Sequence, residues 1–229
     1  MEAHTHQTVP GVSIAIIGSG GAGVMTAGSL LLEAAGKAGY YGIMTRSSGP
    51  QIRGGEAAAM LRLSTVPVES HDDTFDLLLA IDWLNAERFS TEIPLGPHSA
   101  LIGESGAQPP REFLEHGARA IELPLKALAR EIDGGRENMV ALGIVAALVG
   151  LSLEPFRDVL SVTLARKGQS AVESSMSCLE AGAAAVSADE FDFGMPPPTA
   201  PRELWNMSGN EAAGLGAIRG GVRFVAAYP

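Results

Sequence analysis

A glycine-rich loop set between an apolar run and a helical pattern constrains this sequence more than any other feature. Residues 12–17 (VSIAII) form a short apolar run, and Gly18-Ser19-Gly20-Gly21-Ala22-Gly23 follows directly. Helical spacing of apolar residues then predicts a helix over Val24–Ala38, with Gly39 just past its end. The loop fits G-x-G-x-x-G, whose glycines let the backbone turn tightly and approach a ligand. The pattern predicts a strand, a loop whose amides face an anion, and a helix. A tight turn without a ligand is the alternative.

Further apolar runs continue the alternation of strands and helices. Strands are expected at 40–45, 56–64 and 75–81, weaker strands at 99–102 and 120–123, and helices at 83–89, 139–149, 152–164 and 171–186. This order predicts an α/β, Rossmann-like fold with a largely parallel sheet, flanking helices and a helical C-terminal part.

The expected helix Met139–Val149 has no charged residue on any face. Asn138 precedes it and is the expected N-cap. A helix that is apolar all round must be covered on all sides, either by its own domain or by a partner subunit. We favour the partner subunit.

Length, net charge and cysteine count exclude several classes of protein. A length of 229 residues suits one α/β domain with an appendage, and the formal net charge of −10 gives no general attraction to nucleic acid or to an anionic membrane. One cysteine, Cys178, cannot supply the thiolates of an iron–sulfur cluster, and we expect it to be a small buried residue. No stretch predicts a membrane span or a signal peptide, so a cytoplasmic location is expected.

The N-terminal residues 1–10 are expected to form a flexible tail. His4 and His6 lie in it without further ligand residues nearby, so no metal site is predicted.

The segment after the second expected strand carries cationic and hydroxyl side chains. A dinucleotide enzyme would have Asp or Glu here to bind ribose hydroxyls, but Arg46 and Ser47 follow Thr45 instead. An arginine at this position disfavours NAD and FAD but tolerates a phosphorylated ribose, which leaves NADP or the 3′-phosphate of coenzyme A as better candidates. Arg53 completes an anion-binding segment that emerges at the same sheet edge as the glycine loop. A subunit contact or an internal carboxylate partner for Arg53 is the open alternative.

No residues form a recognisable catalytic set. His71, His98 and His116 are scattered, and no serine or cysteine stands in a nucleophile motif. No catalytic residue is therefore predicted in this chain.

The C-terminal part differs from the rest in composition. Four prolines within 193–201 predict a stiff linker over 191–205. Ser208 and Glu211 then fit a capping box that opens a helix to about Arg219, and 222–228 is expected to be a strand. So small a unit cannot bury enough surface to be stable alone, so we expect it to complete a sheet of another polypeptide.

Several motifs together resemble the gamma domain of the 2-oxoacid:ferredoxin oxidoreductases. That domain has a G-x-G-G-x-G loop, a helix ending at Gly-Tyr, and a Ser-x-Gly-Pro-x-x-Arg-Gly-Gly segment. Here stand Gly18–Gly23, Gly39-Tyr40-Tyr41 and Ser47–Gly55 (SSGPQIRGG), in that order. The resemblance covers about Val12–Val186. Residues 209–212 (GNEA) and 221–229 are similar to the start of the alpha, pyrimidine-binding domain.

The resemblance implies a domain order and a function. Residues 11–190 would be the gamma domain and 206–229 the start of the alpha domain, as in the fused gamma–alpha subunit of 2-oxoglutarate:ferredoxin oxidoreductase. Such enzymes convert a 2-oxoacid to an acyl-coenzyme A and reduce ferredoxin. The expected coenzyme A contacts in this chain are Gly18, Ser19, Gly20, Gly21, Gly23, Arg46, Ser47 and Arg53.

The resemblance also implies partners. Thiamine diphosphate, Mg and a 4Fe-4S cluster would be held by partner chains, namely the remaining alpha domain and a beta subunit, with ferredoxin as electron acceptor and a dimer of the assembled unit. The chain alone would be inactive, because the family's thiamine-binding residues lie beyond Pro229. Two alternatives stay open: a free-standing NADP-dependent Rossmann reductase and a non-catalytic dimerisation domain.

Overall fold

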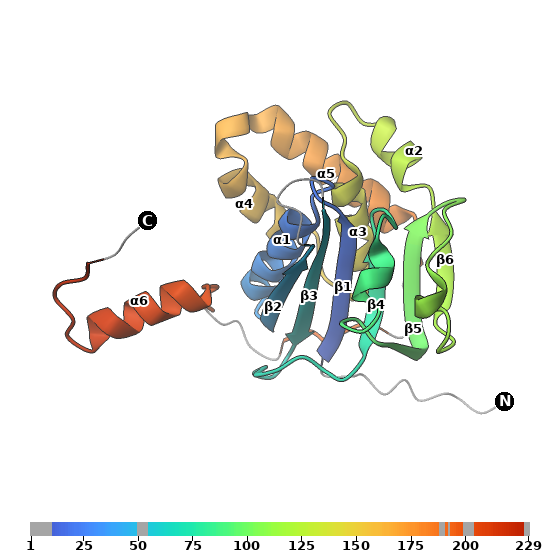
Figure 1. Cartoon of the computed structure of the whole chain (residues 1–229). Helices are drawn as coiled ribbons and strands as arrows, with labels where there is room; N and C mark the ends of the chain where they lie inside the picture. Colours follow the sequence, from blue (N-terminus) through green and yellow to red (C-terminus); the bar gives the residue numbers. More distant parts are fainter. Residues whose placement is uncertain (1–10, 50–54, 188–190, 192, 199–203, 227–229) are drawn as a thin grey trace.

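One mixed sheet organises the domain. The computed structural model describes residues 11–49, 55–187, 191, 193–198 and 204–226. Within these residues the sheet has six strands in the order β2-β3-β1-β4-β5-β6 (Figure 1). Their bounds are β1 Gly11–Ser19, β2 Tyr41–Ser48, β3 Glu56–Ser64, β4 Phe75–Ala80, β5 Leu95–Glu104 and β6 Arg119–Leu123. The α/β prediction is confirmed.

The direction of β3 departs from a fully parallel sheet. β3 pairs antiparallel with both β1 and β2, whereas the β1–β4, β4–β5 and β5–β6 pairs are parallel. β2 therefore runs parallel to β1 but is separated from it by β3. The glycine loop and the end of β2 reach the same edge of the sheet, as expected, two strand spacings apart.

The two faces of the sheet are covered differently. Helices α1 to α5, with the 3-10 helix η3, lie on one face of the sheet, and the 3-10 helices η1 and η2 with loops cover the other (Figure 1). Alternation along β1 divides its side chains between these layers, since Ile14 and Ile16 lie in the helical core while Ala15 and Ile17 pack with Phe89. The helices are α1 Val24–Lys37, α2 Leu125–Arg130, α3 Glu137–Leu148, α4 Glu154–Thr163 and α5 Gln169–Ala184, and the 3-10 helices are η1 Ala86–Phe89, η2 Arg111–Phe113 and η3 Ala165–Lys167.

The apolar helix α3 is covered by its own domain, so the favoured partner-subunit interpretation is wrong. Its residues from Asn138 to Ala146 are all buried within this single chain, mainly against α5. Glycines make the close approach possible: a Cβ at Gly143 would overlap the carbonyl oxygen of Leu179, and one at Gly182 would overlap that of Val140. Two helices that cross at their glycines bury each other without help from outside.

Asn138 is not the N-cap of α3, contrary to the expectation. Arg136 occupies that position with extended backbone angles (φ −137°, ψ 134°), and Asn138 lies inside the first turn. The buried Asn138 amide instead donates to the carbonyl oxygen of Gly23 at 3.3 Å. This hydrogen bond ties the start of α3 to the glycine loop.

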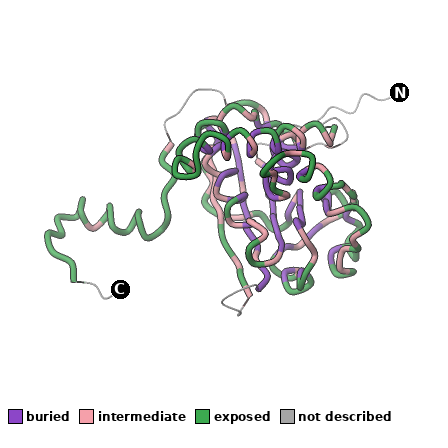
Figure 2. The backbone as a smooth tube through the Cα atoms, turned by 90° about the horizontal axis from the view of Figure 1, so that it is seen from above, coloured by how far each residue is buried: buried purple, intermediate pink, exposed green. Residues whose placement is uncertain are grey.

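An exposed C-terminal arm, defined here as residues 204–226, projects from the domain (Figures 1 and 2). Its helix α6 (Gly209–Arg219) has the predicted capping box, in which Ser208 Oγ accepts from the Glu211 amide and the Glu211 carboxylate accepts from the Ser208 amide. No residue of α6 is buried.

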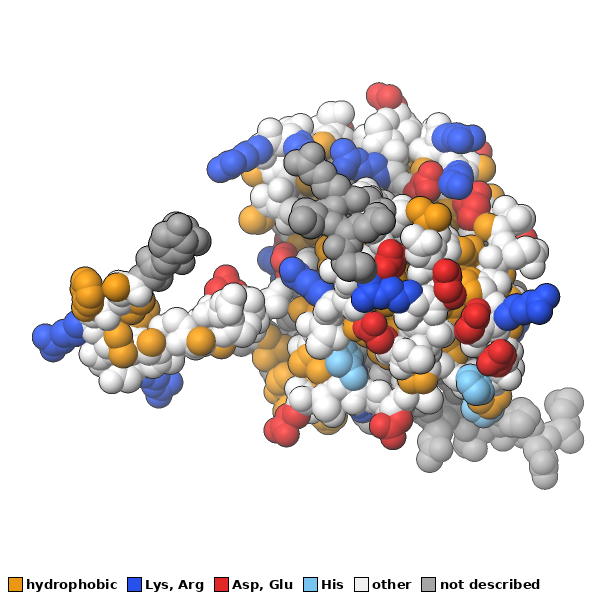
Figure 3. Space-filling model, viewed as in Figure 1, with side chains coloured by type: hydrophobic (Ala, Val, Ile, Leu, Met, Phe, Trp, Pro, Cys, Tyr) orange, Lys and Arg blue, Asp and Glu red, His pale blue; other side chains and the backbone are white. Residues whose placement is uncertain are grey.

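The strand expected at 222–228 is absent from 222–226, the part of that segment lying inside the described residues. Strand backbone needs a partner strand for its hydrogen bonds, and these residues have no neighbouring strand in this chain. Hydrophobic side chains gather on the arm instead (Figure 3), with Trp205 76%, Ile218 72% and Phe224 84% exposed. None of the helices in the described part is long and apolar enough to cross a membrane.

Candidate anion-binding site

The glycine loop turns sharply from β1 into α1. Gly21 (φ 100°) and Gly23 (φ 90°) adopt left-handed backbone that other residues rarely tolerate. Gly23 is the N-cap of α1 and has no side-chain cap, and a Cβ there would overlap the Asn138 amide. The Gly20 amide donates to the Gly55 carbonyl at the start of β3. The loop is therefore fixed on both sides, with the N-terminus of α1 left open.

Asp82, two residues beyond the end of β4, binds the loop from the β4 side. Its carboxylate accepts hydrogen bonds from the Ser19 amide at 3.0–3.1 Å and from the Ser19 hydroxyl at 2.7 Å. It also accepts from the Leu84 amide at 3.1 Å. The Asp82 carboxylate thus accepts hydrogen bonds from both the amide and the hydroxyl of Ser19. A phosphate could bind to Ser19 only by displacing this carboxylate.

A second carboxylate, Glu56, lies next to the same point, because the register of β1 and β3 pairs Ser19 with Glu56. Glu56 forms an ion pair with Arg88 at 2.7 Å, and this hydrogen bond with the guanidinium lowers the pKa of the carboxyl. Of these two carboxylates only Asp82 contacts Ser19, and the charge of Glu56 is neutralised by Arg88. The sheet side of the loop is poorly suited to a further anion.

Arg46, one of the two arginines predicted to accompany the loop, lies on another strand of the sheet. Arg46 is exposed on β2, where its guanidinium lies 3.5 Å from the Ser29 hydroxyl, and Ser47 is its neighbour on the strand. β3 separates both residues from the glycine loop. Arg53 lies outside the described residues. The roles of Arg46, Ser47 and Arg53 stay predictions.

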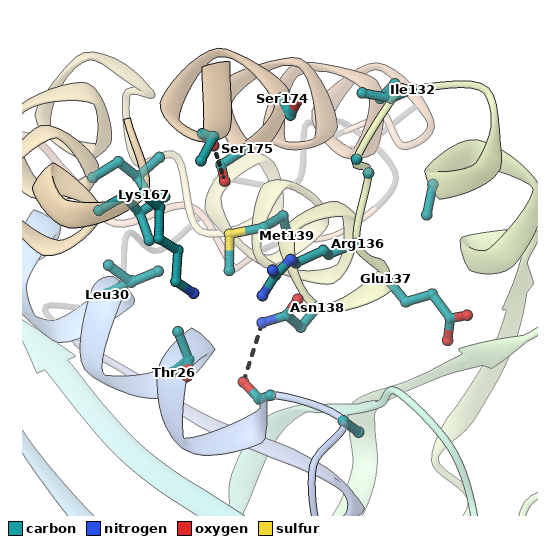
Figure 4. A pocket seen from close by; sticks show the side chains of 18 of the residues that line it. Thr26, Leu30, Ile132, Arg136, Glu137, Asn138, Met139, Lys167, Ser174 and Ser175 are labelled. Carbon is teal, nitrogen blue, oxygen red and sulfur yellow. Dashed lines mark hydrogen bonds between the residues drawn. The ribbon is translucent and has the colours of Figure 1, made fainter. Parts of the chain in front are cut away.

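A cavity of about 1040 Å³ lies on the helical side of the loop (Figure 4). Gly21, Gly23 and Thr26 form its floor, α2 with residues 132–135 and the first turn of α3 form one wall, and α4, η3 and the first turns of α5 close the other. Of the five loop residues predicted to bind a cofactor, Gly21 and Gly23 line this cavity, and Gly18, Ser19 and Gly20 do not.

The cavity is lined by more cations than anions. Its basic residues are Lys126, Arg130, Arg136 and Lys167, and its acidic residues are Asp133 and Glu137. Among the described residues none of these four cations forms an ion pair. Figure 4 shows the Arg136 and Lys167 side chains reaching toward each other above Thr26. This arrangement can bind an anion of nucleotide size.

Other titratable side chains form no catalytic set. Cys178 is buried, as predicted, and burial raises the pKa of its thiol. His71 Nε2 lies 3.0 Å from the Thr45 hydroxyl, far along the chain from the loop. Within the described ranges, no cluster of three or more His, Cys, Asp or Glu side chains could hold a metal ion.

Comparison with known protein families assigns the chain to one family. The model of the pyruvate ferredoxin/flavodoxin oxidoreductase family matches residues 13–185, which is most of the domain described above. The chain belongs to this family. The match begins in β1 and ends just after α5, so it covers the glycine loop and every wall of the cavity.

Curated members of the family are similar over the same region. The ketoisovalerate oxidoreductase subunit VorA of Methanothermobacter thermautotrophicus is 31% identical over 178 residues, covering 76% of this chain and 36% of that protein. The 2-oxoglutarate synthase subunit KorC of Archaeoglobus fulgidus is 31% identical over 160 residues, covering 65% of this chain and 76% of that protein. The chain thus spans about a third of the length of VorA.

Solved structures of family members share the fold. The 2-oxoglutarate:ferredoxin oxidoreductase of Magnetococcus marinus, with 2-oxoglutarate, coenzyme A and succinyl-CoA bound, superimposes with a TM-score of 0.80 at 28% identity, over 93% of this chain and 38% of that chain. The gamma subunit of a keto/oxoacid ferredoxin oxidoreductase from Geobacter sulfurreducens gives a TM-score of 0.59 at 26% identity, over 77% of this chain and 97% of that one.

Sequence reasoning missed the residues that shape the site most. Asp82 follows an ordinary apolar strand, and its contact with Ser19 spans 63 positions. Arg136 and Lys167 belong to helix starts that the sequence places only roughly. The sequence feature that could have pointed to Arg136 is the run 133–136 (DGGR) just before α3. Paired glycines before a helix are typical of a backbone that lies close to another chain segment or to a ligand.

Proposed function

We propose that this chain is the gamma part, with the start of the alpha part, of a 2-oxoacid:ferredoxin oxidoreductase. Residues 11–190 would form the gamma domain, 191–205 a linker and 206–229 the opening of the alpha, pyrimidine-binding domain. The alignment with the Magnetococcus enzyme supports this division, because it covers more of the chain than residues 1–185 could supply. An arm whose helix buries nothing also fits a segment that packs on another polypeptide.

The assembled enzyme would oxidise a 2-oxoacid such as 2-oxoglutarate. The bond to the carboxyl carbon breaks and carbon dioxide leaves, the remaining acyl carbon forms a thioester with the thiol of coenzyme A, and the electrons pass to ferredoxin. Thiamine diphosphate with Mg would stabilise the acyl carbanion, and a 4Fe-4S cluster would carry the electrons, both in the rest of the alpha part and the beta subunit. The complex would work in the cytoplasm, as a dimer of the assembled unit.

The role of this chain would be to bind coenzyme A and to hold the assembly together. The observation that carries this proposal is the open N-terminus of α1 beside a cavity lined by unpaired cations. Backbone amides at a helix start and cationic side chains are the groups that bind phosphate. Arg46, Ser47 and Arg53 are proposed as further contacts from the end of β2.

The two alternatives lose support from the structure. A dinucleotide pyrophosphate would lie over the glycine loop, where the Asp82 carboxylate already accepts the hydrogen bonds of the Ser19 amide and hydroxyl. An NADP-dependent reductase is therefore disfavoured. The dimerisation domain was suggested by an uncovered apolar helix, and α3 is covered within the domain.

Copurification with an activity assay tests the proposal. The tagged chain purified with its native partners should catalyse reduction of ferredoxin that requires both a 2-oxoacid and coenzyme A. The chain purified alone should show no activity and contain no iron. Reduction of NADP by the isolated chain, or a partner complex without oxoacid-dependent activity, would contradict the proposal.

A further inference from the structure

The first half of the C-terminal linker packs on the domain. The Arg119 guanidinium at the start of β6 lies over the Phe191 ring, 4.7 Å from its centroid. Met195 is 6% exposed, and its amide donates to the Val149 carbonyl at the end of α3 at 3.1 Å. Residues 191 and 193–198, called the strap here, are therefore bound to the domain at β6 and at α3.

The strap limits where the arm can lie. Leu204, where the arm begins, is six positions after Pro198, so the chain between them spans at most about 20 Å. Figure 1 shows the arm on the same side of the domain as β2, which is the last strand at that end of the sheet. The polypeptide on which the arm packs should therefore lie beside the β2 end of the sheet.

The outer edge of β2 lacks the features that protect an exposed edge strand. Among the described residues no strand pairs with this edge, since β2 stands first in the strand order. Its register with β3 is unbroken from Tyr41 to Ser48, so it has no bulge, and it contains no proline and one charged residue, Arg46. Bulges, prolines and several charges are the usual means of preventing an edge from pairing with other chains. The edge of β2 is therefore suited to pairing in an assembled protein.

Apolar side chains adjoin this edge. Tyr41 pairs with Ser64, the last residue of β3, and Val66 lies two positions further along the chain. Val66 is 52% exposed, and Ile43 and Val68 are half-buried. Figure 3 shows hydrophobic side chains at this corner of the domain, next to the base of the arm. An exposed apolar group beside an open strand edge is typical of a protein interface.

We propose that the rest of the alpha part packs on the β2 edge surface, which comprises β2 and residues 65–68, an inference that rests on the proposed function. The partner surface should present a strand to β2 and apolar side chains to Val66. The β2 edge surface is separate from the cavity beside the glycine loop, because no residue of β2 or of 65–68 lines that cavity. Variants at this surface therefore leave the cavity unchanged.

Site-directed crosslinking of the assembled complex tests this contact. The one cysteine of the chain, Cys178, is buried, so Val66→Cys provides an accessible thiol for a photoactivatable label. The labelled chain should crosslink to the alpha part, which mass spectrometry of the product identifies. Leu114→Cys is the matched control, since Leu114 is 39% exposed and lies between β5 and β6, toward the other end of the sheet. It should give no crosslink to the alpha part.

A charge on the β2 edge surface gives a second measure. Val66→Asp should weaken the affinity for the alpha part about tenfold or more, because the contact would bury an unpaired carboxylate. Leu114→Asp should bind the alpha part like wild type. Because Val66 is 52% exposed, the isolated Val66→Asp chain should keep the wild-type melting temperature, which separates a lost contact from a loss of folding.

Hydrogen exchange gives a readout that needs no variant. Amides in 41–48 and 65–68 should exchange more slowly in the complex than in the isolated chain. An active complex in which these amides are unprotected and Val66→Cys gives no crosslink would overturn the interface but leave the proposed function intact. An isolated chain that dimerises through 41–48 would also overturn it, since a second copy would then cover the edge. A tagged chain that captures no oxoacid-dependent activity would refute the proposed function and this inference with it.

Discussion

His71 is a residue whose protonation the fold opposes. Burial lowers the pKa of its imidazole, and the nearby charge of Arg62 lowers it further. In the unfolded chain His71 takes up a proton near pH 6.5, so acidification below about that value stabilises the unfolded state first. We therefore expect the free energy of unfolding to fall as the pH drops from about 7 to about 5, and to fall less in His71→Gln. Urea denaturation at both pH values measures this, and an equal loss in both proteins would exclude His71 as the cause.

At the scale of elements, the contact between α3 and α5 depends on glycine. Because a Cβ at Gly143 would overlap the Leu179 carbonyl, a backbone atom, Gly143→Ala must push the helices apart. We expect a loss of about 1–3 kcal/mol in the free energy of unfolding, as for other overpacked sites. Gly36→Ala in α1 is the control, since nothing lies within 4 Å of its added Cβ. That variant should gain up to about 1 kcal/mol. Denaturant titrations measure the free energy of unfolding of both variants. Equal changes in Gly143→Ala and Gly36→Ala would contradict the close crossing of α3 and α5.

At the scale of the whole molecule, we expect the arm to contribute nothing to the stability of the domain. None of the α6 residues is buried, and an isolated helix of this length is marginal in water. Deleting residues 204–229 should therefore leave the melting temperature of the domain unchanged. Limited proteolysis of the isolated chain should cut the arm first, because its backbone is open to a protease. A melting temperature several degrees lower after deletion would mean that the arm packs on the domain.

Local features of the fold followed from the sequence, and distant pairings did not. The apolar run before Gly18 and the glycines after it predicted β1, the loop and α1, since each depends on neighbouring residues. The antiparallel direction of β3 depends on its register with β1 and β2, which no short pattern encodes. Likewise, the lack of charge on α3 predicted burial but not that α5 supplies the cover.

The same division explains which residues of the candidate site could be predicted from the sequence. Gly21 and Gly23 were predicted because their spacing is local. Asp82, Arg136 and Lys167 come from other elements and reach the loop only through the tertiary fold. Arg46 was chosen for its place after β2, and β3 stands between that place and the loop.

The antiparallel direction of β3 has a consequence for the order in which the strands of the sheet pair during folding. β2 and β3 pair over eight register positions and are joined by only seven residues, 49–55, so this hairpin closes a short loop at little entropic cost. β1 then pairs along the other edge of β3 over nine positions. Docking of β1 also brings the Gly20 amide to the Gly55 carbonyl. We therefore expect the glycine loop to take its shape in the same folding step that joins the first strand to the hairpin, so that the candidate site forms only after this step.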